Sequence, residues 1–198
     1  MMMGSFINRI MKQCSLVFFV YFFISCNGTG GGGGTTPPNL LVPRNSPDLH
    51  RMGIEWRYKG MLFTGYIIQQ QNDSIIISSV PVINGRENGI ATIFYKNGIK
   101  RVEESIVNEQ LDGRYNEWWR NGNYRYRFNY KNNLYDGVQI VFFEDGKIRE
   151  ESNYANGALE GLQRVWDDSG RLISNYTIRN KKMYGVISVK SCMPGSEH

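Results

Sequence analysis

The chain has 198 residues, of which 41% are hydrophobic and 21% are charged, and its formal net charge is +5. It contains three cysteines and two histidines, which leaves little material for disulfide bonds or for histidine-based metal sites. Basic and acidic residues alternate, as in "KIREES" (147–152), and no block of Lys and Arg could hold a phosphate backbone, so we expect no nucleic-acid partner.

Residues 1–25 have the composition of a secretory signal peptide. Arg9 and Lys12 precede nine apolar residues at 16–24, a run well short of the about 20 residues that span a bilayer. The sequence therefore predicts a signal helix over 1–25, with either Met1 or Met11 as the true start.

The segment "FISC" (23–26) resembles the lipobox of bacterial lipoproteins, although Phe23 stands where leucine is usual. The resemblance implies cleavage after Ser25 and attachment of diacylglycerol to Cys26. It also implies an exported protein held by its lipid at the bacterial cell membrane or the outer membrane. An ordinary signal peptide and an uncleaved membrane anchor remain as alternatives.

Residues 26–50 include "NGTGGGGGTTPPNLLVPRNSPD" (27–48), which is rich in Gly, Pro, Thr and Ser. Such a composition is typical of a flexible tether, which would let a folded domain stand away from the membrane. With Cys14 in the signal and Cys26 lipidated, only Cys192 remains, so we expect no intramolecular disulfide.

Residues 51–190 repeat with a period of 24, and residues 191–198 form a short tail. Two glycine series keep this spacing. The outer series is Gly65, Gly89, Gly113, Gly137, Gly161 and Gly185, and the inner series is Gly98, Gly122, Gly146 and Gly170.

Each repeat unit has the pattern of a β-hairpin. Asn or Asp often precedes the inner glycine, which favours a two-residue turn in which both residues have positive φ. The arm "NYRYRFNY" (123–130) alternates, so we expect its four aromatic residues on one face and its two arginines, exposed to solvent, on the other. Pro81 lacks a ladder donor and predicts an edge-like or broken strand. The prediction is an all-β fold: an elongated antiparallel sheet of tandem β-hairpin repeats, preceded by the signal helix and the tether.

The segment "FFEDGKIREESNYANGALEG" (142–161) resembles the MORN-variant repeat, and the resemblance extends over about residues 54–190. It implies hairpin units that stack into an elongated sheet. Many bacterial proteins of this kind are grouped as antitoxin-like, which implies a second role, the neutralisation of a toxin by direct binding.

The sequence contains no constellation typical of an enzyme. His50 and His198 lack metal-ligand partners at useful spacing, and no phosphate-binding loop is present, so we expect no catalytic residues, no metal site and no cofactor. We expect a non-catalytic domain that binds a protein or an envelope polymer. The candidate contact residues, on the face opposite Phe94 and Trp118, are Tyr95, Trp119, Phe143, Arg101, Arg125 and Arg149.

Overall fold

The computed structural model describes residues 37–72 and 75–186, and this part of the chain forms strands and turns without a helix. The predicted all-β fold of consecutive antiparallel hairpins is confirmed. The predicted signal peptide, Cys26 and the C-terminal tail lie outside the described residues.

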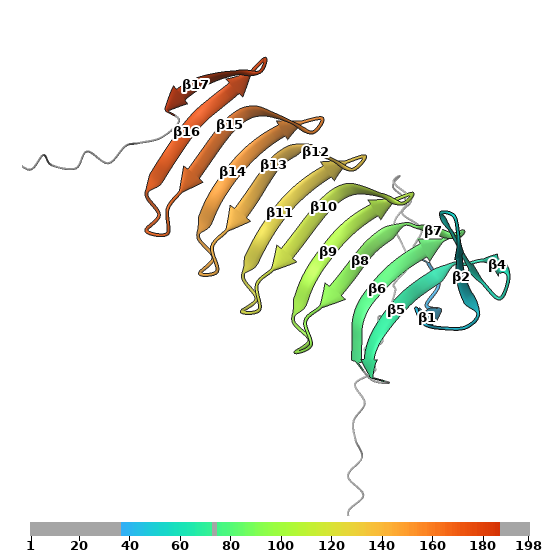
Figure 1. The fold of residues 1–198 in the computed structure, drawn as a ribbon. Coiled ribbons are helices and arrows are strands. Elements are labelled where there is room, and N and C mark those ends of the chain that lie inside the picture. The colour runs from blue at the N-terminus through green and yellow to red at the C-terminus, as the bar shows by residue number, and fades with distance from the viewer. Residues whose placement is uncertain (1–36, 73–74, 187–198) are drawn as a thin grey trace, which may run out of the picture. The chain divides into compact units, whose positions relative to one another are not determined.

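Most of the described chain belongs to one 14-stranded sheet in which strands adjacent in sequence are neighbours in space (Figure 1). The strands from the middle to the C-terminal end form successive antiparallel hairpins. The sheet consists of β1 (Leu41–Pro43), β5 (Gly65–Asn72), β6 (Ile75–Ile83), β7 (Arg86–Glu87), β8 (Gly89–Phe94), β9 (Lys100–Val107), β10 (Gln110–Trp118), β11 (Tyr124–Lys131), β12 (Leu134–Tyr135), β13 (Gly137–Phe142), β14 (Ile148–Ala155), β15 (Ala158–Trp166), β16 (Leu172–Arg179) and β17 (Lys182–Val186).

A second sheet of three strands lies at the N-terminal end, formed by β2 (Leu49–Met52), β3 (Glu55–Tyr58) and β4 (Met61–Leu62). Together with β1, which pairs in parallel with β5, it builds the hydrophobic core of this end. The core residues are Val42, Leu49, Trp56, Phe63, Ile67 and Val82.

The predicted extent of the tether, residues 26–50, is wrong from residue 37 onward. Val42 of β1 is 2% exposed and Leu49 of β2 is 7% exposed, because both belong to the hydrophobic core. The short apolar run at 40–42 has prolines on both sides, and their presence led to its interpretation as part of a linker. A strand beside the sheet edge needs few apolar residues, since the backbone of β5 supplies its hydrogen bonds.

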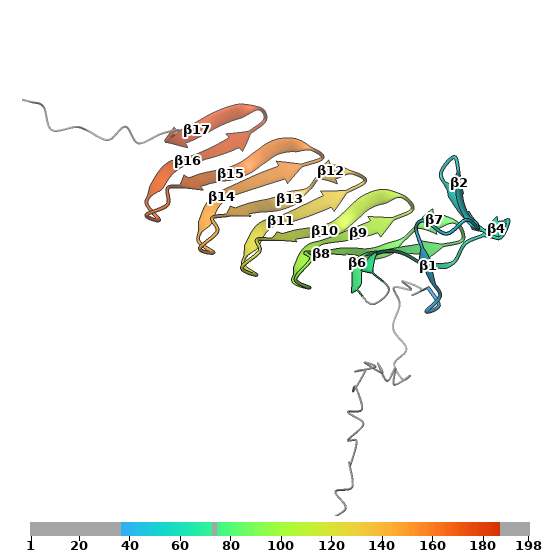
Figure 2. The ribbon, with the colours of Figure 1, turned by 60° about the horizontal axis from the view of Figure 1, so that its bottom comes forward.

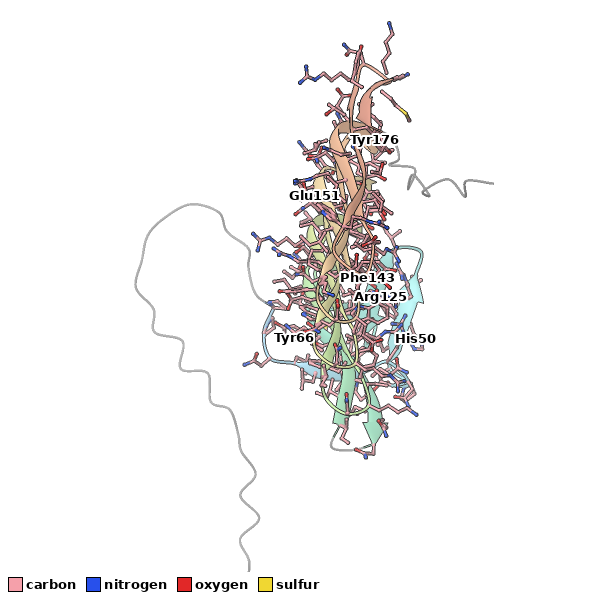
Figure 3. The ribbon with its side chains drawn as sticks, turned by 90° about the vertical axis from the view of Figure 1, so that its left-hand side faces the viewer. His50, Tyr66, Arg125, Phe143, Glu151 and Tyr176 are labelled. Carbon is pink, nitrogen blue, oxygen red and sulfur yellow. The ribbon has the colours of Figure 1, made fainter. Side chains whose placement is uncertain are left out.

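Beyond this core the sheet is a single layer, and each strand has two faces (Figure 3). Arg125, Phe143 and Tyr176 lie on one side of the ribbon in this view, whereas Tyr66 and Glu151 lie on the other. We call the first side face 1 and the second face 2. Face 1 is defined by residues that pair directly across neighbouring strands: Ser78, Ile93, Val102, Glu117, Tyr126, Val141, Glu150, Val165 and Ser174.

The hairpin tips that carry the inner glycines follow one another along one side of the sheet (Figure 2). At the first of them, Gly98 has φ +83°, whereas Asn97 does not adopt positive φ. The Tyr95 carbonyl accepts from the Gly98 N–H at 2.9 Å, and the Tyr95 N–H donates to the Ile99 carbonyl at 2.8 Å. These bonds define a type I turn that ends in a left-handed glycine, so the predicted two-residue turn is wrong at this position.

The two-residue turns with positive φ at both positions lie at the other end of the hairpins. Asn108 and Glu109, for example, have φ values of 50° and 69°. Asparagine tolerates this conformation better than most residues, which explains why Asn recurs there every 24 residues. The Glu109 N–H donates to the Glu87 carbonyl at 3.0 Å, and the Asn133 and Gly157 N–H groups bond the preceding unit in the same way.

Three outer glycines, Gly65, Gly89 and Gly137, are the first residues of their strands, whereas Gly113 and Gly161 lie inside strands at irregularities of pairing. Gly113 of β10 has φ +107°, and the register between β10 and β9 shifts between Leu111 and Tyr115. A Cβ at Gly113 would lie 3.0 Å from the Cβ of Ser105 on the adjacent strand. A side chain is therefore disfavoured twice, by the backbone angle and by the close approach of β9.

Pro81 occupies an interior strand, so the predicted edge-like or broken strand is wrong. It lies in β6, which pairs with β5 on one side and with β7 and β8 on the other. The Pro81 carbonyl accepts from the Asn88 N–H at 3.0 Å, at the break between β7 and β8. The missing N–H of Pro81 faces the same break, where no ladder partner requires it.

Candidate binding surface on face 1

A bulge at the start of each second arm decides which side chains reach face 1. Between β10 and β11, Glu117 pairs with Tyr126, but the next residue of β10 pairs with Tyr124. Arg125 is therefore the extra residue, and such a bulge turns it to the same face as its neighbour Tyr126. The Arg125 Nη1 lies 3.0 Å from Glu117 Oε1, which confirms its place on face 1.

This bulge overturns the expected alternation of "NYRYRFNY". Tyr124 shares face 2 with Trp118, whose ring centroid lies 5.3 Å away, and does not join Tyr126 and Phe128 on face 1. The Arg125 guanidinium lies 4.9 Å from the Tyr126 ring centroid, so this arginine and the tyrosine do not occupy opposite faces. Strict alternation could not reveal this, because the extra residue resets the period.

The first cluster of the candidate contact residues surrounds Tyr95. The Tyr95 hydroxyl donates to the Trp118 carbonyl at 2.9 Å, which fixes the ring. The guanidinium carbons of Arg101 and Arg120 lie 5.8 Å and 5.6 Å from its centroid. Tyr95 thus makes cation–π contacts with two arginines.

The second cluster repeats this arrangement one unit later. The Arg125 guanidinium lies 4.5 Å from the Trp119 ring centroid and also bonds Glu117, which is 8% exposed. Glu117 accepts a further bond from the Tyr115 hydroxyl at 3.0 Å. Arg125 is therefore neutralised and packed, in contrast to Arg101.

The third predicted pair, Phe143 and Arg149, is not brought together in the same way. Arg149 is exposed, and among the described residues no cation–π contact joins it to Phe143. The equivalents of Arg120 in the following tips are Glu144 and Asp168, so the basic character of face 1 declines toward the C-terminal units.

A hollow of about 1060 Å³ lies on face 1, between the N-terminal strands and the first two tips. The residues that line it include two carboxylates, Glu87 and Glu104, and a larger number of cations. The cations are Arg44, Arg51, Lys96, Arg101, Arg120 and Arg125.

Four of these cations were missed by the sequence prediction. Arg44 and Arg51 lie in or beside segments interpreted as tether, and only the fold brings them to the hollow. The sequence does contain a pattern that identifies Lys96 and Arg120. Each directly follows the aromatic residue of its tip, and the two positions are 24 residues apart.

Burial and charge shift two ionisable groups beside the hollow. Burial raises the pKa of the Glu104 carboxyl, and the negative charge of Glu87 raises it further. Burial also raises the pKa of the Tyr115 hydroxyl, and its hydrogen bond to Glu117 acts in the same direction. Both shifts favour the neutral form of the group.

Within residues 37–72 and 75–186, no group of three or more His, Cys, Asp or Glu side chains could hold a metal ion. The same part of the chain contains no helix long and apolar enough to cross a membrane.

One repeat unit consists of a hairpin with its bulge and its tip. Two segments of the chain, each close to one unit in length, match a family model. Residues 111–132 and 135–156 match the MORN repeat variant. The two matched MORN segments start 24 residues apart and coincide with the β10–β11 and β12–β14 regions. The chain matches no curated protein. MORN repeats are commonly non-catalytic repeats that bind proteins or membranes.

Proposed function

We propose that this chain is a non-catalytic binding protein of the bacterial envelope and that face 1 is its recognition surface. Its partner is a protein or an envelope polymer. The protein is exported and is held at a membrane by lipid on Cys26.

One observation carries the binding role: arginines are displayed on face 1 around fixed aromatic rings, without full neutralisation. Arg101 and Arg120 rest on Tyr95 and have no carboxylate within ion-pair distance among the described residues. Arginine and aromatic side chains are the types most enriched where binding energy is concentrated in interfaces. An extended single-layer sheet presents them on a broad, open surface.

Site-specific photocrosslinking in the producing cells tests this role. A photoreactive residue is placed at Arg101 on face 1 or, as the matched control, at the exposed Arg127 on face 2. We expect a crosslinked partner from position 101 and not from position 127. Equal products from both positions, or none from either, would contradict the proposal. A toxin as the crosslinked partner would support the antitoxin role that the repeat resemblance implies.

The lipid anchor is supported by the residues around Cys26 and is tested separately. We expect Cys26→Ser to move the protein from the membrane fraction to the soluble fraction, with Cys14→Ser as the matched control that stays in the membrane. Full retention of the Cys26→Ser protein would point instead to an uncleaved signal helix as the anchor.

A further inference from the structure

We propose that the hollow on face 1 binds an acidic segment of a partner protein that also carries apolar side chains. This inference rests on the proposed binding function and assigns its ligand chemistry. It follows from the charge of the rim, the fixed positions of the arginines and the apolar floor.

We call the six cations that line the hollow its rim, and these cations are only partly neutralised. Arg51 bonds Glu109 at 2.9 Å, and Arg125 bonds Glu117 at 3.0 Å. In the described part of the chain, the other four cations of the rim have no carboxylate within ion-pair distance: Arg44, Lys96, Arg101 and Arg120. The six cations outnumber the two carboxylates of the hollow, Glu87 and Glu104, and this excess of positive charge favours an anionic ligand and repels a cationic one.

The arginines of the rim are held before any ligand arrives. Tyr95 is fixed by its bond to the Trp118 carbonyl and carries the guanidinium groups of Arg101 and Arg120 on its ring. Arg44 rests in the same way on Trp56, with 5.6 Å between guanidinium and ring centroid. A guanidinium held in place loses less side-chain entropy when it bonds a carboxylate, and its planar fork matches that group.

Part of the lining of the hollow is aliphatic, and we call this part its floor. Ile77, Val80, Ala91 and Ile93 line it, and Ile93 is 36% exposed. Such a floor stabilises a ligand that buries apolar side chains, whereas a polymer made only of acidic sugars has none to offer. The Tyr95 ring already contacts two guanidinium groups, which compete with a sugar for stacking on it.

Fluorescence anisotropy with defined probes tests the assignment on the full-length chain in neutral detergent. The main probe is a labelled synthetic peptide of alternating leucine and glutamate. The comparison probes are an alternating serine–glutamate peptide, an alternating leucine–lysine peptide, polygalacturonate fragments and vesicles that contain phosphatidylglycerol. We expect the leucine–glutamate peptide to bind most tightly and the leucine–lysine peptide not to bind.

The variant Arg101→Gln/Arg120→Gln should weaken binding of the leucine–glutamate peptide by about tenfold or more, because two close charge pairs are lost. The matched control is Arg127→Gln, which removes an exposed face 2 arginine outside the hollow and should leave the affinity unchanged. Circular dichroism of each variant establishes that the sheet is intact.

Three outcomes would overturn the inference. Equal binding of the serine–glutamate peptide would mean that the floor is not used. Preferential binding of polygalacturonate or of the anionic vesicles, sensitive to Arg101→Gln/Arg120→Gln, would assign the hollow to a polymer or to a lipid surface. If no probe binds, the hollow is not a site for anionic ligands. The proposed function would still stand, because it is tested by the crosslinked partner on face 1.

Discussion

Gln139 shows how a single side chain can replace part of a sheet ladder. It is 4% exposed, and its amide oxygen accepts from the Asn129 N–H at 2.9 Å while its Nε2 donates to the Asn129 carbonyl at 3.0 Å. Gln163 takes the same place one unit later, with Nε2 3.0 Å from the Asn153 carbonyl. Both glutamines lie where the strands separate at a bulge, and they satisfy backbone groups that would otherwise be buried without a partner.

We expect Gln139→Leu to lower the free energy of unfolding by about 2–4 kcal/mol, because it leaves the Asn129 N–H and carbonyl unpaired inside the sheet. Urea unfolding followed by tryptophan fluorescence measures the loss. Gln110→Leu is the matched control, since Gln110 is exposed and should tolerate leucine. A loss no greater than that of the control would mean that water satisfies Asn129 as well as glutamine does.

Glu104 provides a pH-dependent contribution. Its pKa is raised by burial and by Glu87, so the folded state binds a proton more readily than the unfolded state. The favourable contribution of Glu104 is therefore complete below the pKa of the unfolded chain and is lost as the pH rises through the folded pKa.

We expect Glu104→Gln to raise the melting temperature at pH 7, because the variant no longer has a charge to desolvate. The gain should shrink as the pH falls through the raised folded pKa of Glu104 toward the pKa of an ordinary glutamate, about 4.3, and should change no further below it. Differential scanning calorimetry across this range measures it, with the exposed Glu144→Gln as control. An equal gain in melting temperature at low and at neutral pH would show that packing, and not ionisation, causes the difference in stability between glutamate and glutamine at position 104.

At the scale of the elements, the short strands β1 and β2 complete the hydrophobic core of the N-terminal end. β1 pairs with β5 through Leu41, Val42 and Pro43, and the Arg44 N–H continues this contact to the Ile68 carbonyl at 2.8 Å. Without β1, the edge of β5 would be open to pairing with other chains.

A chain that begins at residue 51 should therefore be less stable than one that begins at residue 37. The shorter chain loses Val42 and Leu49 from the core, each worth about 1.5–3 kcal/mol of burial, and it exposes the β5 edge. Urea midpoints and size-exclusion chromatography compare the two, and we expect self-association of the shorter chain alone. Equal midpoints and equal elution would show that the segment before residue 51 adds nothing to the fold.

At the scale of the whole described sheet, apolar burial is uneven. Ten of the buried hydrophobic residues lie between Val42 and Ile106, and Ile178 is the only one in the described part of the chain after that. The buried residues between them are polar: Glu117, Gln139, Ser152 and Gln163. In a repeat array each unit is stabilised mainly by its neighbours, so the distant units share little of the N-terminal core.

Hydrogen exchange should consequently show protection that declines from the N-terminal to the C-terminal strands. We expect the amides of β5 and β6 to exchange most slowly and those of β15 to β17 fastest, because local opening follows the local density of buried apolar contacts. Mass spectrometry of peptides from each hairpin measures this gradient. Uniform protection across the hairpins would show that the sheet unfolds as one cooperative unit.

The sequence by itself determined the period, the all-β hairpin architecture and the positions of the bends. The reason is that glycine and asparagine are tied to backbone angles that other residues resist, as at Gly98 and Asn108. It also indicated that Tyr95 and Trp119 share a surface with Arg101 and Arg125, since all four recur at the same spacing.

Only the tertiary structure decided which turn type lies at which end, that Arg125 shares its face with Tyr126, and that residues 37–50 belong to the fold. Each of these depends on pairing between strands. A one-residue bulge resets the alternation of an arm, and a three-residue strand gains its stability from the edge that it covers. The cations of the hollow come from segments as far apart as Arg44 and Arg125, and the periodicity of one repeat does not specify what the first unit packs against.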